Sequence, residues 1–254
     1  DRGKVIVEQM KILLYEAQKV EKLAAQNLTD EISGDLSLAV IPTIAPYILP
    51  QLFPVLATRY PLLKLKIREM QTHKIIEALD EDSVDVGLLA TPLKLDRMTE
   101  FALYFEPFSV LAHVKHPLCK KSKITYTDLS SEGLWLLEEG HCLRNQMLDV
   151  CALRKSKGMQ LKFEFESGSI ETLKRLVNAY EGFTLVPALA VDEAPQSAKY
   201  VEFERPIPSR EVGLIYRREV FKAPLIEALG ECILESIPSK IKKLRKKDLD
   251  VLPI

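Results

Sequence analysis

The feature that most constrains the fold of this chain is a regular alternation of strand-like and helix-like segments over residues 36–90. Strand candidates lie at 36–41, 63–70 and 84–90, and helical stretches separate them at 47–59 and 74–81. This order predicts parallel strands, because each helix carries the chain back to the start of the next strand. We therefore expect an α/β fold with a parallel sheet in this part of the chain.

The remainder of the chain predicts a second unit of the same kind. Strand candidates lie near 105–114, 134–137, 159–165, 183–187 and 200–203, with helices near 170–180 and after Cys142. A strand at 211–217 is expected to return to the first unit, and a helix at 223–237 to close it. The expected fold is two Rossmann-like lobes, like those of periplasmic binding proteins, joined by two crossover strands. Lobe I would hold residues 32–105 and 211–254, and lobe II residues 106–210.

The first part of the chain predicts a long helix ahead of the lobes. Residues 4–27 carry apolar side chains at steps of three and four, a spacing typical of an amphipathic helix with a coiled-coil seam. We expect residues 1–31 to form a linker or dimerisation helix, although a helix that packs on its own domain would show the same pattern. The apolar positions are Val7, Met10, Leu13, Leu14, Ala17, Val20, Leu23 and Ala24.

The charge balance argues against a chain that holds nucleic acid by an overall positive field. Lys and Arg number 35, Asp and Glu number 36, and the net charge is −1, whereas DNA phosphates attract clusters of cations. If the protein binds DNA, we expect another segment to do so. The basic run at 240–247 is expected to be an exposed, solvated face. No apolar run approaches the roughly 20 residues that a membrane-spanning helix needs, so we expect a cytoplasmic protein without membrane contact.

Two of the four cysteines, Cys142 and Cys151, lie close together in the sequence. In one continuous helix their Cα atoms would lie about 13.5 Å apart, whereas a disulfide needs roughly 4.4–6.8 Å. The helix and the bond therefore cannot coexist, and forming the bond would unwind the segment. Closing a loop of about ten residues contributes on the order of 2–3 kcal/mol, which is similar to the cost of refolding one or two helical turns. A conditional disulfide here, if it forms, would therefore switch the segment between two shapes.

The neighbours of the two thiols favour different roles for them. Cys142 has His141 beside it and Arg144 close by, and both favour the thiolate. It also follows Gly140, where a helix is expected to begin, although the two glutamates before that glycine oppose the effect. Cys151 has apolar neighbours, which are typical of a buried thiol that reacts only after exposure. The spacing alone also fits two ordinary buried cysteines.

Other residue types give little support for a metal site or an enzyme. Cys119 and Cys232 have no second cysteine close by in the sequence, and we interpret them as bystanders. The four histidines are scattered, and the chain has no C-x2-C pair, nucleotide-binding glycine loop or nucleophile-elbow motif. We therefore expect no metal, no cofactor and no enzyme. Thr43 and Thr72 each follow a strand and precede a helix, where a hydroxyl either caps the helix or faces the crevice between the lobes.

Several segments resemble the effector-binding domain of LysR-type transcriptional regulators. They are 34–43 (GDLSLAVIPT), 49–50 (LP), 60–61 (YP) and 84–86 (VDV). A second set resembles more specifically the peroxide-sensing OxyR group of that family: 71–73 (QTH), 140–144 (GHCLR) with Gln146 and Cys151, Ser169 with 171–173 (ETL), and 185–191 (LVPALAV). The resemblance runs from the linker helix to about residue 237, which is nearly the whole chain.

The resemblance implies a redox-sensing regulator that forms a homodimer or homotetramer. Such a regulator binds promoter DNA through an N-terminal winged helix-turn-helix, which we expect to lie outside this chain, and it contacts RNA polymerase. Hydrogen peroxide would oxidise Cys142 to a sulfenic acid, Cys151 would capture it as a disulfide, and a glutaredoxin- or thioredoxin-type reductant would reset it. The change would switch transcription of oxidative-stress genes. The residues expected to hold peroxide, order water or support the thiolate are Thr43, Thr72, His141, Arg144, Gln146 and Arg210.

One departure from the resemblance bears on proton transfer, and two alternatives remain open. Where the family commonly has an acid that takes part in proton handling, this chain has Asn145. In the first alternative the lobes close on a small organic ligand and the cysteines are incidental; Thr43 and Thr72 fit this equally well. In the second the chain is a thiol peroxidase that turns over with a reductant. The linker helix favours a sensor, which reacts about once per chain.

Overall fold

The computed structural model describes residues 32–130, 133–151, 167–194, 196–218 and 222–254, and eight positions in the first 31 residues. Those eight (2, 3, 6, 9, 10, 13, 17 and 20) are helical and exposed. The rest of the predicted linker helix and the predicted strand at 159–165 lie outside the described residues.

Lobe I contains the parallel sheet that the sequence predicts. Strands β1 (Gly34–Val40), β2 (Leu63–Glu69) and β3 (Val86–Thr91) pair in parallel in the order β2-β1-β3. Helices α2 (Ala45–Arg59) and α3 (Thr72–Asp80) connect them. A Cβ at Gly87 of β3 would lie 2.5 Å from Cγ2 of Ile75, so only glycine lets α3 pack this closely against the sheet.

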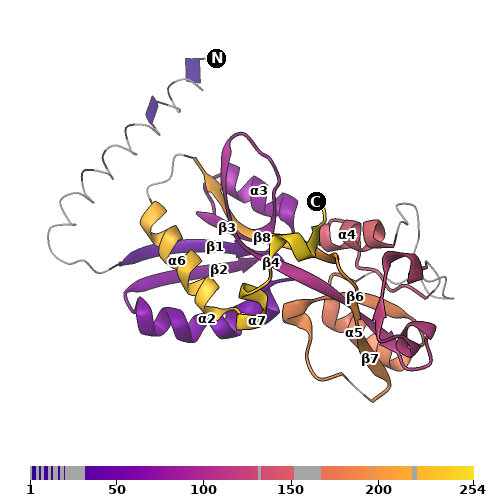
Figure 1. Cartoon of the computed structure of the whole chain (residues 1–254). Coiled ribbons are helices and arrows are strands. Elements are labelled where there is room, and N and C mark those ends of the chain that lie inside the picture. The colour runs from indigo at the N-terminus through magenta and orange to yellow at the C-terminus, as the bar shows by residue number, and fades with distance from the viewer. Residues whose placement is uncertain are drawn as a thin grey trace.

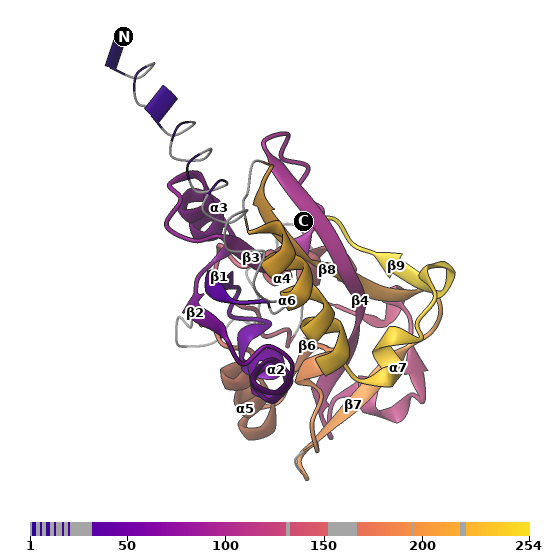
Figure 2. The same ribbon diagram turned by 90° about the vertical axis from the view of Figure 1, so that its left-hand side faces the viewer.

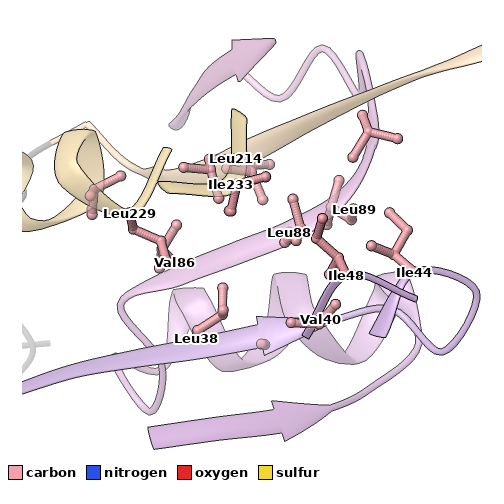
Figure 3. Close-up of a cluster of buried hydrophobic side chains, with 14 of the residues drawn as sticks. Leu38, Val40, Ile44, Ile48, Val86, Leu88, Leu89, Leu214, Leu229 and Ile233 are labelled. Carbon is pink, nitrogen blue, oxygen red and sulfur yellow. The ribbon is translucent and has the colours of Figure 1, made fainter. Parts of the chain in front are cut away.

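The core of lobe I lies between this sheet and the helices α2 and α6 (Ala223–Ser236). Figure 3 shows Val86 and Leu88 of β3 close to Ile48 of α2 and to Leu229 and Ile233 of α6, and all five side chains are buried. Because side chains alternate across a strand, Val86 and Leu88 face these helices while Gly87 faces α3. The sheet is therefore covered on both faces.

Two long antiparallel strands carry the chain between the lobes. β4 (Met98–His113) pairs with β8 (Ile207–Arg217) over nearly the whole length of β8. Its second half pairs with β6 (Phe183–Pro187) and β7 (Ala198–Phe203) of lobe II. Figure 1 shows β4 running between the two groups of elements. The fold of two α/β lobes joined by two crossover strands is confirmed, but the expected lobe boundaries near 105 and 210 fall inside these strands.

Lobe II has its own core and its own pair of helices, α4 (Cys142–Val150) and α5 (Ile170–Ala179). A short strand, β5 (Lys123–Ile124), pairs with β7. The strand predicted at 134–137 is wrong, because only a single bridge from Leu134 to Phe183 forms there. All four residues of that run are at most 8% exposed, so its apolar character reflects burial on every side rather than a strand face.

The C-terminal segment crosses the junction of the lobes, as Figure 2 shows on the side away from α3. It contains α7 (Ser239–Lys242) and β9 (Leu249–Val251), and β9 pairs in parallel with the start of β8. Every Lys and Arg of the basic run 240–247 is exposed, as the sequence predicts. No helix within the described ranges has both the length and the apolar character that crossing a membrane requires.

Candidate functional site

The N-termini of two helices from different lobes meet at Cys142. α3 of lobe I begins at Thr72, and α4 of lobe II begins at Cys142. The Thr72 hydroxyl Oγ1 lies 3.2 Å from the Cys142 sulfur. The preceding residues, Gln71 and His141, are the N-caps of the two helices, and their Nε2 atoms lie 3.3 Å apart. The N-terminal, positive ends of both helix dipoles therefore lie at the position of Cys142.

Gly140 makes this approach possible. Its φ is +91°, a backbone conformation that side chains disfavour, and a Cβ there would lie 2.9 Å from Oε1 of Gln71. The chain then takes an extended conformation at His141 and enters α4. The helix predicted after Cys142 is thus confirmed, and it begins at the thiol itself.

A small polar cluster surrounds this helix start. His141 is 6% exposed, and its Nε2 lies 3.4 Å from Oε1 of Glu138. Nε2 of Gln71 donates to the same Glu138 oxygen at 3.4 Å, so the cluster joins both lobes. Arg144 donates from Nη1 to the carbonyl of Leu137 at 2.6 Å, which ties α4 to the loop that precedes it. Both residues expected near the thiol thus lie at the start of its own helix, and the Glu138 carboxylate lies beside His141.

Cys151 lies at the opposite end of the same helix. It is the C-cap of α4, it is 4% exposed, and it packs in the apolar core of lobe II. This burial raises the pKa of its thiol to about 12. Both thiols are free, and Cys142 is the more exposed of the two. At about 1.5 Å of rise per residue, the helix separates the two Cα atoms by roughly 13.5 Å, too far for a disulfide.

Gln146 has an unusual position one turn after Cys142. Its side chain is fully buried, and neither the amide nitrogen nor the amide oxygen has a hydrogen-bond partner among the described residues. Residues four apart lie on the same face of a helix, so Gln146 follows Cys142 on that face of α4. A buried amide of this kind normally bonds to water or a ligand.

Thr43 and Arg210, also predicted as site residues, belong to a second cluster. Arg210 donates to the Thr43 hydroxyl at 2.9 Å and to the Thr43 carbonyl at 3.0 Å, and it forms an ion pair with Glu106. Its described contacts do not include Cys142, in contrast to the expected support of the thiolate. The structure therefore places the Thr72 hydroxyl at the Cys142 sulfur. His141, Arg144 and Gln146 lie at or within the helix that begins there, and Thr43 contacts Arg210.

The sequence reasoning assigned no role to Glu106 or to Gln71. A signal for Glu106 exists, since it is the only charged residue in the otherwise aromatic and apolar run 103–108 of β4. A lone acid in such a strand predicts a buried cation partner. Within the described ranges, no group of three or more His, Cys, Asp or Glu side chains is arranged to hold a metal ion.

Comparisons with known proteins show the family to which the chain belongs. The family model for the LysR substrate binding domain matches residues 29–238. A hydrogen peroxide-inducible genes activator of Dickeya chrysanthemi is 32% identical over 244 residues, which cover 95% of this chain and 79% of that protein. The DNA-binding transcriptional dual regulator OxyR of Escherichia coli is 32% identical over 247 residues, covering 96% of this chain and 80% of that protein.

The same similarity holds among solved structures. The reduced form of the OxyR regulatory domain from Pseudomonas aeruginosa superposes with a TM-score of 0.71 at 32% identity, covering 79% of this chain and 97% of that chain. The chain therefore belongs to the LysR-type family, within its OxyR group.

Proposed function

We propose that this chain is the redox-sensing regulatory domain of a DNA-binding transcriptional regulator, and that hydrogen peroxide acts on Cys142. One observation carries the proposal: Cys142 and Cys151 are free thiols at the two ends of one helix, with the first accessible at the helix start and the second buried. The relatives named as hydrogen peroxide-inducible genes activators support it.

The chemistry proceeds in two steps. The Cys142 thiolate attacks one peroxide oxygen, the O–O bond breaks, and the second oxygen leaves as hydroxide, which takes a proton to become water. Cys142 is then a sulfenic acid. The Cys151 thiol next attacks the Cys142 sulfur, the S–O bond breaks, and a second water leaves as the disulfide forms. A glutaredoxin- or thioredoxin-type dithiol would return both residues to thiols.

The residues around the sulfur would assist the first step. We infer that Thr72 donates its hydroxyl proton towards the reacting sulfur or the peroxide. His141 and Gln146 would hold peroxide or order water beside it, and Arg144 would add positive charge. The Asn145 side chain cannot take a proton, so proton transfer would rely on these neighbours.

Disulfide formation would remodel lobe II, because α4 cannot persist while its two ends are joined. Leu143, Met147 and Val150 of α4 are at most 1% exposed and belong to the core of lobe II. Unwinding the helix would remove them from that core. The disulfide offsets part of this cost, on the order of 2–3 kcal/mol for a loop of about ten residues. The two states are then close enough in free energy for oxidation to select between them.

The rest of the regulator follows from the family relationship. We propose a homodimer or homotetramer in which residues 1–31 form the linker helix, and whose contacts change when α4 unwinds. Promoter DNA would bind to a winged helix-turn-helix outside this chain, as expected for relatives of a DNA-binding regulator. RNA polymerase would be the partner through which transcription responds, and the protein would act in the cytoplasm without membrane contact.

The alternative of an organic ligand in the crevice has less support. Thr43, one of the two hydroxyls that it requires, already accepts a hydrogen bond from Arg210 at 2.9 Å and is 2% exposed. A ligand at that position would have to share this buried hydroxyl with the guanidinium.

The test is non-reducing peptide mapping after one equivalent of hydrogen peroxide. We expect a loss of two hydrogens that maps to a Cys142–Cys151 bond. In a Cys151→Ser variant, sulfenic acid should accumulate at Cys142 and be trapped by dimedone, whereas Cys142→Ser should not react. Cys119→Ser is the matched control and should behave as the parent protein. If both thiols stay free in the parent, the proposal is wrong and a crevice ligand should be sought.

A further inference from the structure

A fully buried ion pair lies where the two crossover strands pass between the lobes. Glu106 of β4 and Arg210 of β8 are 0% and 1% exposed, and their register places them opposite each other. Oε2 of Glu106 accepts hydrogen bonds from Nε of Arg210 at 2.9 Å and from Nη2 at 2.7 Å. Both bonds converge on one carboxylate oxygen, and together they fix the direction of the planar guanidinium relative to the carboxylate.

The remaining atoms of this pair reach one segment of each lobe. Arg210 donates to the hydroxyl and carbonyl oxygens of Thr43, which follows β1 in lobe I. The other carboxylate oxygen of Glu106 accepts a hydrogen bond from the backbone nitrogen of Leu189 at 2.8 Å, and Leu189 follows β6 in lobe II. The pair therefore joins four chain segments, and it links lobe I to lobe II at their junction.

The energetics of such a pair favour a role in geometry. Removing two charges from water costs several kcal/mol, and an apolar pair of similar volume usually stabilises a fold as well or better. What the charged pair adds is a fixed direction, which an apolar contact lacks. Geometry matters here because the hydrogen bond between Thr72 and Cys142 also runs from lobe I to lobe II.

We propose that Glu106 and Arg210 are positioning residues for the thiol site. The ion pair fixes the angle between the lobes, and this angle keeps the Thr72 hydroxyl in contact with the Cys142 sulfur. The consequence for peroxide rests on the proposed function above, but the consequence for the reactivity of Cys142 does not. Neither residue of the pair needs to contact the sulfur for this role.

The test is a double-mutant cycle in a Cys151→Ser background, with two readouts of Cys142. The first is the rate of sulfenic acid formation with hydrogen peroxide, and the second is the rate of alkylation by iodoacetamide. Thr72→Val, which removes the hydroxyl, should slow peroxide oxidation roughly tenfold, the effect of losing one hydrogen bond to a charged group. Glu106→Gln should slow it by a similar factor, and the double variant should be no slower than Thr72→Val alone.

The same pattern of non-additivity is expected for alkylation. If the two substitutions multiply, or if Glu106→Gln leaves both rates unchanged, the proposal is wrong. Asp192→Asn is the matched control: it breaks the ion pair with Lys174, 2.8 Å away within lobe II, and should leave both rates unchanged.

The test also distinguishes a variant that does not fold from a failure of the proposed function. If Glu106→Gln does not fold, Arg210→Lys replaces it, because a lysine keeps the buried charge but cannot reach Glu106 and both Thr43 oxygens at once; the same non-additivity is expected. If the parent protein does not react with peroxide, the proposed function fails, and the alkylation cycle still tests the positioning role by itself.

Discussion

Replacing Met147 with alanine should make the Cys142–Cys151 disulfide harder to reduce. Met147 is 0% exposed in the core of lobe II, and it lies in the middle of α4. Its side chain stabilises the reduced state, in which the helix is intact. If oxidation unwinds α4, the oxidised state has already lost that contact, so the substitution destabilises the reduced state alone.

The size of the shift in reduction potential follows from the free-energy cost of the cavity that the substitution leaves. Truncating a buried methionine to alanine costs about 2–5 kcal/mol, and for a two-electron couple about 1.4 kcal/mol corresponds to roughly 30 mV. The reduction potential should therefore become more negative by about 40–100 mV. The assay is equilibration of the purified protein in glutathione redox buffers, followed by quantification of the disulfide by mass spectrometry.

Leu173→Ala is the matched control for this prediction. Leu173 is 1% exposed in the same core but belongs to α5, which the switch does not need to unwind. Its loss should destabilise both redox states equally and leave the potential unchanged. Equal potentials for the Met147→Ala variant and the parent protein, or equal shifts in the two variants, would refute the unwinding of α4.

Three further predictions concern the same lobe. Burial raises the pKa of Cys151 to about 12, above the roughly 8.5 of an unfolded thiol, so the contribution of this thiol to stability is complete below pH 8.5 and is lost as the pH rises towards 12. The free energy of unfolding of Cys151→Ala should therefore decline less steeply over that pH range than that of the parent protein, and an equal decline would count against the burial argument. Gly140→Ala, at φ +91°, should lower the free energy of unfolding by about 1–2 kcal/mol and slow peroxide oxidation of Cys142. An unchanged melting curve would contradict the backbone strain that a side chain at this turn should cause. Gln146→Leu should leave the free energy of unfolding unchanged or raise it by about 1 kcal/mol, since it removes a buried amide without a described partner, and it should slow the reaction of Cys142 with peroxide. A large loss of stability would show that the amide serves the fold instead.

Local pattern predicts most of the described elements of this fold. The strand at 183–187 coincides with β6, and the three parallel strands of lobe I lie within two residues of their expected ends. The failures come from non-local packing. An apolar run such as 134–137 does not distinguish a strand from a buried loop, and the sequence gives no sign that β4 continues for 16 residues through both lobes.

The candidate site shows the same difference between local features, which the sequence pattern predicts, and non-local contacts, which it does not. The start of α4 at Cys142 follows from the turn at Gly140, and the burial of Cys151 follows from its apolar neighbours. The hydrogen bond between Thr72 and Cys142 joins residues 70 positions apart, and the ion pair of Glu106 and Arg210 joins residues 104 positions apart. Such contacts depend on the lobe arrangement, which the sequence pattern alone does not specify. Arg210 was expected to support the thiolate, and its described hydrogen bonds are with Thr43 and Glu106.

The most direct test of the switch is amide hydrogen exchange, followed by mass spectrometry, in the reduced protein and in the protein carrying the Cys142–Cys151 disulfide. The amides of α4 form a hydrogen-bonded helix in the reduced state, and they should exchange far faster after oxidation, while those of α5 stay protected. If α4 remains as protected with the disulfide as without it, the bond forms without unwinding the helix, and the account of the switch is wrong.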